Sequence, residues 1–274
     1  MGSGIASWFA SQNIFVELVD VDQKLSQKAL ANIYQNWSNL VTKNKYSQIQ
    51  IEDFKRYLSI NSVNTLKNNY DLVIEAIIEI KDIKIELFKN LDKIMNVNTI
   101  FASNTSSISI ASLTEGLPIH RQQKFLGLHF FNPAPVMKLV EVVKTEKTDK
   151  SLAKDLFRWF ESHGKKPAVC KDSPGFIVNR VARNFYGEAF RIVETFNPKL
   201  ISETDHVLEQ VAGFKMGPFK LMDLIGIDVN LLVTESIWKA TSHNPRFSPH
   251  SLQKKMVENG QLGKKTKKGF YDYE

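Results

Sequence analysis

The sequence has little cysteine, no long apolar run and no cluster of metal-ligating residues, and each shortage excludes a class of protein. Its single cysteine, Cys170, excludes a disulfide within the chain and favours a reducing compartment, so we expect a cytoplasmic protein. No apolar run approaches the roughly 20 residues of a membrane-spanning helix, and the N-terminus lacks the basic start of a signal peptide. The six histidines are scattered, so we expect no metal and no membrane partner.

Dense positive charge is also scarce, although the formal net charge is +7. The one lysine cluster, residues 264–268, has no interleaved aromatic side chains, so we expect no nucleic-acid partner. A moderate positive charge instead suits an anionic ligand such as a nucleotide or coenzyme A. The chain has 274 residues, of which 43% are hydrophobic and 24% charged. These values indicate a globular protein that is long enough for two domains.

The glycine loop of a dinucleotide-binding unit is only partly present. Residues 1–10 predict a helix, and residues 13–20 predict a strand that ends at Asp20. Gly2 corresponds to the third glycine of G-x-G-x-x-G, which allows close helix–strand packing, and Asp20 to the acid that binds the ribose 2′-hydroxyl of NAD. The first strand and the first two glycines are missing, and this half-motif alone is common in α/β proteins.

The missing strand has a physical consequence. Strand 1 is central in the doubly wound order, so its neighbours are expected to lose a pairing partner. We therefore expect the chain as written to bind NAD poorly and to be less stable than a version with that strand. Either the true start lies upstream, which we favour, or the cofactor site has been lost.

The most informative stretch is residues 126–143. Two strand-like runs flank the turn Asn132–Pro135, and each run carries one ionisable side chain, His129 or Glu141. A carboxylate beside an imidazole fixes its tautomer and stabilises the imidazolium, which makes a general-base pair. Because the pairing register cannot be read from the sequence, a buried hairpin with a satisfied histidine remains an alternative.

Other candidate residues follow predicted strands, where ligands bind in open α/β sheets. Glu79 follows an apolar strand at 71–78 and precedes a helix that contains Lys84. The hydroxyl-rich turn 104–107, which includes Ser106, follows a strand at 99–103. The plainer interpretations are an acid at a helix N-terminus and a helix cap. Residues 23–58 predict two polar helices, the second ending at Leu58.

The character of the chain changes at Asp172–Ser173. Residues after this point predict only helices and loops, so we place domains at 1–172 and 173–274. A long helix is expected to start at Ser173, with Asn179 about one turn in. Asn179 alone is more often a packing residue, and Lys265 alone is more often a solvated charge.

Taken together, these stretches resemble the L-3-hydroxyacyl-CoA dehydrogenase family, short-chain or 3-hydroxybutyryl-CoA dehydrogenase-like. The string GLHFFNPAPVMKLVEVV at 127–143 carries most of the resemblance. The resemblance occurs at six places, in the same order along the chain as in the family: 1–6, 71–79, 101–107, 126–143, 173–180 and 263–273. The resemblance implies a Rossmann-type α/β NAD-binding domain, truncated at its N-terminus, followed by an all-α domain for substrate binding and dimerisation.

The implied reaction is NAD-dependent oxidation of an L-3-hydroxyacyl-CoA to a 3-ketoacyl-CoA, in fatty acid beta-oxidation or butanoate metabolism. A short acyl chain, an acyl-CoA partner and a homodimer are also implied. The implied catalytic residues are His129, Glu141, Ser106 and Asn179, of which Ser106 and Asn179 also bind substrate. The implied NAD-binding residues are Gly2, Asp20, Glu79, Lys84, Ser106, Asn132 and Lys265.

Two alternatives remain open. The first is a catalytically impaired relative that binds acyl-CoA or a protein partner without turnover, which the missing glycine loop favours. The second is a related oxidoreductase that acts on a different hydroxy acid, such as a sugar acid. The His129 and Glu141 string argues against the second alternative, and the intact set of catalytic residues argues against the first.

Overall fold

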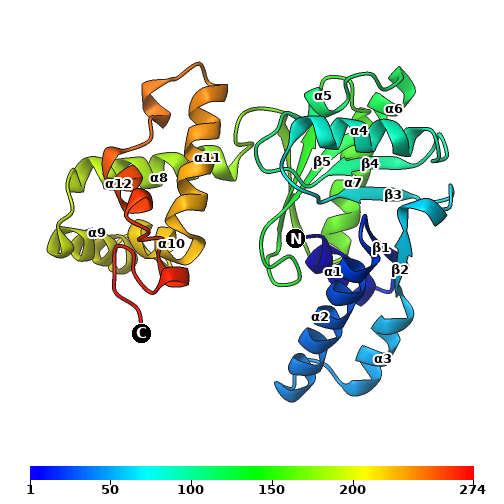
Figure 1. Cartoon of the computed structure of the whole chain (residues 1–274), viewed down its shortest axis with the longest axis horizontal. Helices are drawn as coiled ribbons and strands as arrows, with labels where there is room; N and C mark the ends of the chain where they lie inside the picture. Colours follow the sequence, from blue (N-terminus) through cyan, green and yellow to red (C-terminus); the bar gives the residue numbers. More distant parts are fainter. The chain divides into compact units, whose positions relative to one another are not determined.

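A computed structural model describes residues 1–274, and Figure 1 shows how its elements follow one another. The chain divides into two units, Met1–Asp172 and Ser173–Glu274. The division falls where the sequence changes character. The first unit contains all the strands and the second contains helices and loops, which confirms the expected fold class. Each unit is described by itself.

The first unit contains two sheets. The smaller sheet pairs β1 (Val16–Asp20) in parallel with β2 (Leu58–Ser62). The larger sheet has the order β3-β4-β5-β6-β7 and is parallel except between β5 and β6. Its strands are β3 (Leu72–Glu75), β4 (Ile100–Ser103), β5 (Phe125–Phe130), β6 (Leu139–Lys144) and β7 (Lys166–Lys171). β1 and β3 are edge strands, each with a single neighbour.

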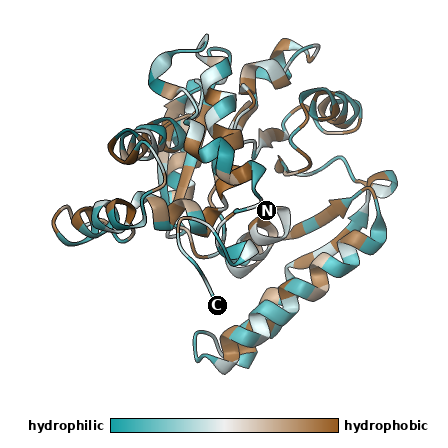
Figure 2. Ribbon diagram, turned by 60° about the vertical axis from the view of Figure 1, so that its left-hand side comes forward, coloured by the Kyte–Doolittle hydropathy of each residue, from teal (hydrophilic) through white to brown (hydrophobic).

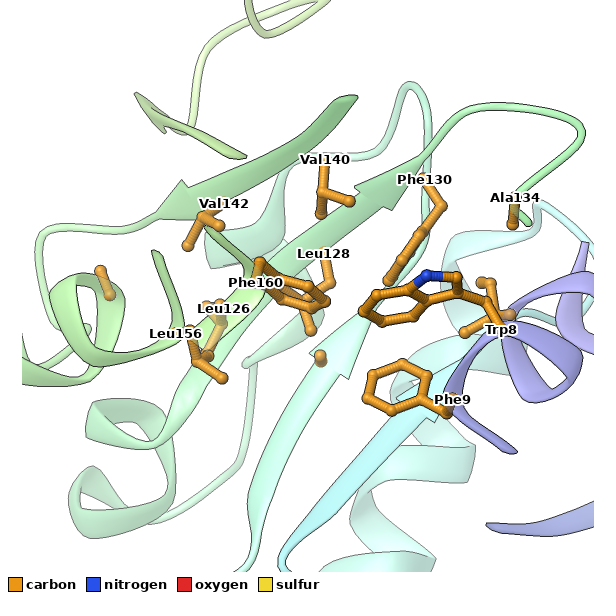
Figure 3. Close-up of a cluster of buried hydrophobic side chains, with 13 residues drawn as sticks. Trp8, Phe9, Leu126, Leu128, Phe130, Ala134, Val140, Val142, Leu156 and Phe160 are labelled. Atoms are coloured by element: carbon orange, nitrogen blue, oxygen red, sulfur yellow. The ribbon is translucent and has the colours of Figure 1, made fainter. Parts of the chain in front are cut away.

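Helices cover both faces of the larger sheet. They are α1 (Gly2–Ser11), α4 (Lys81–Asp92), α5 (Ile110–Leu113), α6 (Ile119–Gln123) and α7 (Lys150–Ser162). On one face, Trp8 of α1 packs between Phe130 and Phe160, with ring centroids 6.1 and 5.7 Å away; Figure 3 shows this aromatic cluster. On the other face, Phe88 of α4 lies 4.5 Å from Phe125. These aromatic contacts fix the strands that carry the candidate site.

The smaller sheet supports the helices α2 (Gln23–Thr42) and α3 (Gln48–Arg56). Figure 2 shows polar and apolar residues alternating along α2, whose buried face includes Ile33 and Trp37. The prediction that the second helix reaches Leu58 is wrong, because α3 ends at Arg56 and Leu58 begins β2, followed by the short 3-10 turn η1 (Val63–Thr65). The five-residue strand β2 was not predicted at all.

The strand predicted over 71–78 is also shorter than expected. It ends at Glu75, whose buried carboxylate accepts the N–H of Ile77 at 2.7 Å. That hydrogen bond turns the chain out of the sheet. Ile77 and Ile78 are consequently 43% and 58% exposed, although their apolar character suggested a buried strand.

The second unit is helical. Its helices are α8 (Val178–Val193), α9 (Pro198–Gln210), α10 (Pro218–Ile225), α11 (Ile227–Ala240) and α12 (Ser251–Glu258), with 3-10 turns η2 (Pro245–Phe247) and η3 (Lys264–Thr266). One expectation needs correction. The helix α8 begins at Val178 rather than Ser173, so Asn179 lies in its first turn. Gly226 separates α10 from α11, and its φ of 103° is unfavourable for other residues.

Two buried aspartates tie the C-terminal segment to this helical unit. Asp205 accepts hydrogen bonds from the Phe219 N–H at 3.0 Å and the Tyr271 hydroxyl at 2.8 Å. Asp223 accepts the Phe270 N–H at 3.0 Å and the Tyr273 hydroxyl at 2.9 Å. Both carboxylates therefore have strong donors in the interior. None of the helices in the chain combines the length and apolar character of a membrane span.

Candidate active site

His129 and Glu141 lie directly opposite each other on the antiparallel strands β5 and β6. The two side chains are 6% and 0% exposed, and His129 Nδ1 is 2.6 Å from Glu141 Oε2. With Nδ1 donating its proton to the carboxylate, the lone pair lies on Nε2, the ring nitrogen that can accept a proton. The structure thus brings this predicted pair into contact and supplies the register that the sequence could not.

A glycine on β5 allows α5 to pack closely against β5 and β6. Gly127 pairs with Val143 two residues before His129. A Cβ at Gly127 would lie 2.8 Å from Ile110 Cδ1 and 2.9 Å from Val143 Cβ. These distances are too short for any side chain, so glycine at this position lets α5 close over the sheet beside the histidine.

The turn that contains Ser106 is fixed to both neighbouring strands. Asn104 accepts the Phe130 N–H at 2.8 Å through its side-chain oxygen, which joins the end of β4 to the strand of His129. Glu79 accepts the Ser106 N–H at 3.0 Å and the Ser107 N–H at 3.2 Å, and also a hydrogen bond from the Thr105 hydroxyl. The half-buried Ser106 is therefore held by backbone contacts on the carboxyl side of the sheet.

Beneath this turn is a chain of charged groups. Lys84 is 1% exposed, and its Nζ is 2.6 Å from Glu75 and 3.0 Å from Glu79. Burial raises the pKa of Glu79, but the Thr105 hydrogen bond and the Lys84 charge outweigh it and hold the pKa below its usual value. Glu79 is therefore ionised at neutral pH. Lys84 is a buried support for this carboxylate, and Glu75, a residue that sequence reasoning missed, completes the group.

Two cofactor candidates of the first unit, Gly2 and Asp20, lie at the start of α1 and at the end of β1. Asp20 is exposed at the carboxyl end of β1, and no side chain caps the N-terminus of α1. An uncapped helix N-terminus suits a pyrophosphate, and the acid suits a ribose hydroxyl, so these groups fit NAD. An added Cβ on Gly2 would lie 3.5 Å from Ala76 Cβ, which is ordinary contact. Close packing at Gly2 therefore does not itself require glycine.

Asn132 is exposed in the turn between β5 and β6. This turn is anchored from below by Lys165, whose Nζ donates to the carbonyls of Ala134 at 2.6 Å and Met137 at 2.7 Å. The same ammonium lies 4.6 Å from the Trp8 ring centroid. Burial lowers the pKa of Lys165 to about 8. Sequence reasoning missed Lys165 because a lysine between Gly164 and Lys166 does not differ in pattern from an exposed charge.

Asn179 and Lys265 belong to the second unit. Asn179 is half-buried in the first turn of α8, and its backbone carbonyl accepts a hydrogen bond from Arg183. Lys265 is 46% exposed, and its Nζ lies 2.6 Å from both carboxylate oxygens of Asp228. Lys265 is thus an ion-pair residue.

No three His, Cys, Asp or Glu side chains are grouped closely enough to hold a metal ion. Cys170 is buried, and burial together with the charges of Glu141 and Asp172 raises its pKa to about 12. Its thiol therefore stays protonated at neutral pH, as expected for a small packing residue.

Two family models match the chain, "3-hydroxyacyl-CoA dehydrogenase, NAD binding domain" over residues 1–173 and "3-hydroxyacyl-CoA dehydrogenase, C-terminal domain" over 175–273. The chain is 40% identical to mitochondrial hydroxyacyl-coenzyme A dehydrogenase of Sus scrofa, over 100% of this chain and 88% of the relative. It is 41% identical to 3-hydroxyadipyl-CoA dehydrogenase of Escherichia coli strain K12, over 100% of this chain and 57% of the relative. The solved 3-hydroxybutyryl-CoA dehydrogenase of Escherichia coli K12 matches with a TM-score of 0.94 and 40% identity, over 100% of this chain and 57% of that one.

Proposed function

The chain belongs to the 3-hydroxyacyl-CoA dehydrogenase family, and on that premise we propose how its residues carry out the reaction. It is an NAD-dependent oxidoreductase that oxidises 3-hydroxyacyl-CoA to 3-ketoacyl-CoA. The observation that carries the proposed mechanism is the buried contact between His129 and Glu141. It joins an imidazole, the side chain most often used as a general base, to a carboxylate that fixes its tautomer.

In the proposed mechanism, His129 Nε2 accepts the proton of the substrate's 3-hydroxyl group as the C–H bond at carbon 3 breaks. NAD, when bound, accepts the hydride. Accepting this proton converts His129 to an imidazolium, and the fully buried carboxylate of Glu141, 2.6 Å away, stabilises that positive charge. In the reverse direction the imidazolium returns the proton to the carbonyl oxygen.

Neutral donors are proposed to orient the substrate. The Ser106 hydroxyl and the Asn179 amide can donate to the reacting oxygen or the thioester carbonyl without competing for the proton. Glu79 holds the backbone of the Ser106 turn through two N–H groups. This fixed backbone reduces the reorganisation that the turn needs when substrate binds.

Several residues are proposed to hold NAD. Asp20 would accept hydrogen bonds from the ribose hydroxyls. The N-terminus of α1, at Gly2, would bind the pyrophosphate. Asn132, Glu79 and Lys265 would contact the nicotinamide half. Lys84 would act through Glu79, because its ammonium is already committed to two carboxylates.

We propose that the acyl chain is short. Relatives named 3-hydroxybutyryl-CoA dehydrogenase, in Clostridioides difficile, and 3-hydroxyadipyl-CoA dehydrogenase, in Escherichia coli, support this. We also propose that the protein is located in the cytoplasm, because its single cysteine suits a reducing compartment. The Sus scrofa relative, in contrast, is named as mitochondrial.

The proposed function is tested by following NADH oxidation with acetoacetyl-CoA, with longer 3-ketoacyl-CoA substrates and with NADPH in place of NADH. We expect turnover with NADH and the highest kcat/KM for the short substrate. Turnover confined to longer chains would overturn the chain-length proposal. Binding of acyl-CoA without any turnover, in a folded protein, would favour the impaired relative instead.

A homodimer formed through the second unit is also proposed. This unit exposes several large apolar side chains, and such side chains are typical of subunit interfaces. They include Val181 at 64%, Ile192 at 58%, Val211 at 81% and Leu232 at 68% exposed.

A further inference from the structure

The second unit contains a cavity of about 180 Å³ that the proposed reaction does not use. It lies between α8, α11, η2 and the start of α12. Three arginines and one histidine line it, and no aspartate or glutamate does: Arg183, Arg191, Arg246 and His250. The cavity is therefore strongly biased toward negative ligands.

Arg183 is the central feature of this cavity. It is 5% exposed, and its guanidinium bonds only to neutral acceptors. Nε donates to the Asn179 carbonyl at 3.2 Å, while Nη1 donates to the Asn230 carbonyl at 2.8 Å and the Thr234 hydroxyl at 2.7 Å. No carboxylate pairs with it, and Nη2 makes no hydrogen bond. Nη2 is not among the sealed, unpartnered atoms of the interior, so its two N–H groups are accessible to a ligand.

One buried donor of the same network has no partner. Asn230 is 2% exposed, and its Nδ2 has no hydrogen-bond partner. Its Oδ1 accepts from Arg183 Nη1 at 3.2 Å and from Gln253 Nε2 at 2.9 Å, and Gln253 lines the cavity. Rotating the amide would turn its N–H groups toward those donors, so the orientation is fixed and the missing acceptor is real.

The rim adds two further arginines and a neutral histidine. Arg246 is exposed, and its Nε donates to Asn184 at 2.8 Å. Arg191 forms an ion pair with Glu188, which does not line the cavity. His250 accepts the Leu252 N–H through Nδ1 at 3.3 Å, so its proton lies on Nε2. Burial lowers the pKa of Arg183 to about 10, which still leaves it charged at neutral pH.

We propose that this cavity is a binding site for a small oxyanion, either phosphate or a short carboxylate, held by the Arg183 guanidinium. The planar fork of an arginine matches the paired oxygens of such anions. The volume suits an anion of this size, since one water occupies about 30 Å³ in the liquid. It is too small for a whole NAD or coenzyme A, because sites for larger ligands measure roughly 300–1,000 Å³.

The test measures thermal unfolding of the full chain at rising concentrations of sodium phosphate and, separately, of sodium acetate. Sodium chloride at matched ionic strength is the control for screening. We expect a saturable rise in Tm with one or both oxyanions and no comparable rise with chloride, because a ligand that binds only the folded state stabilises it. The two arms distinguish phosphate from carboxylate.

Three variants complete the test. Arg183→Gln should remove the oxyanion-specific shift. Arg246→Gln keeps the buried guanidinium and should weaken the affinity at least about three-fold, so it serves if Arg183→Gln does not fold. Arg158→Gln, an exposed arginine of α7 in the first unit, should bind as the unchanged chain does. Equal shifts with chloride, no shift at all, or shifts unaltered in both cavity variants would overturn the proposal.

Discussion

At the scale of single residues, the contact between Glu141 and His129 has the largest chemical consequence. Glu141 is fully buried and 2.6 Å from the imidazole. Replacing its carboxylate with a neutral amide removes the charge that stabilises the imidazolium. We expect Glu141→Gln to lower kcat about 10²–10⁴-fold, the range for a general base, with a smaller change in KM. Steady-state kinetics check this, and a kcat within a factor of five of the unchanged chain would contradict it.

Lys165 gives a pH prediction. Burial lowers its folded pKa from 10.5 to about 8, so between these values the unfolded chain binds more protons than the folded one. Stability from this group therefore rises with pH through that window. Between pH 7.5 and pH 10 we expect the unfolding free energy of the unchanged chain to gain about 2 kcal/mol relative to Lys165→Met.

Urea unfolding at the two pH values measures this difference. The neighbouring Lys166→Met is the control, because Lys166 is exposed. A difference between the unchanged chain and Lys165→Met that does not vary with pH would show that Lys165 is not desolvated as described.

Single residues also show what a sequence can reveal. His129 and Glu141 were predictable because they stand in a long, specific string. Lys165 and Glu75 were not, because their roles depend on carbonyls and charges from distant parts of the chain. Lys165, for example, bonds to carbonyls 31 and 28 residues away.

At the scale of elements, the charged group formed by Glu75, Lys84 and Glu79 joins β3, α4 and the turn after β4. Removing the cation leaves Glu75 with no positive partner in the interior, a change that costs about 3–5 kcal/mol. We expect Lys84→Met to lower the unfolding free energy by that amount. Denaturant unfolding checks this.

The matched control is Lys81→Met on the same helix. Lys81 pairs with Glu115, and the two side chains are 43% and 60% exposed. Exposed pairs contribute at most about 1 kcal/mol, so this variant should be nearly neutral. Equal losses in both variants would mean that the buried group is not a special support of the turn.

Most elements could be predicted from apolar periodicity, and the errors have physical causes. β2 was missed because its five residues, Leu58–Ser62, are mostly polar and directly follow a helix. The end of β3 depends on the Glu75 side chain, which bonds to the backbone two residues later.

At the scale of the whole molecule, the proposed residues come from both units, with Asn179 and Lys265 in the second. Strand-like patterns in the sequence stop at 172–173, where the chain also divides into its two units. The pairing of His129 with Glu141 could not be predicted, because it needed the register of β5 and β6.

The proposed homodimer gives a prediction at this scale. Leu232 is 68% exposed on α11 of the helical unit. We expect the unchanged chain to have the mass of a dimer by light scattering, and Leu232→Lys to shift it toward the monomer. Leu25→Lys, which changes a 50% exposed leucine of the first unit, should remain dimeric. A monomeric mass for the unchanged chain would contradict the proposal.

The central claim, that His129 takes the hydroxyl proton, is tested most directly by His129→Gln. The measurement is NADH oxidation with acetoacetyl-CoA, together with the NADH affinity from fluorescence titration. The account predicts that kcat falls at least about 10²-fold while the NADH affinity stays within about a factor of two. A variant that binds NADH and keeps most of its turnover would show that another group moves the proton.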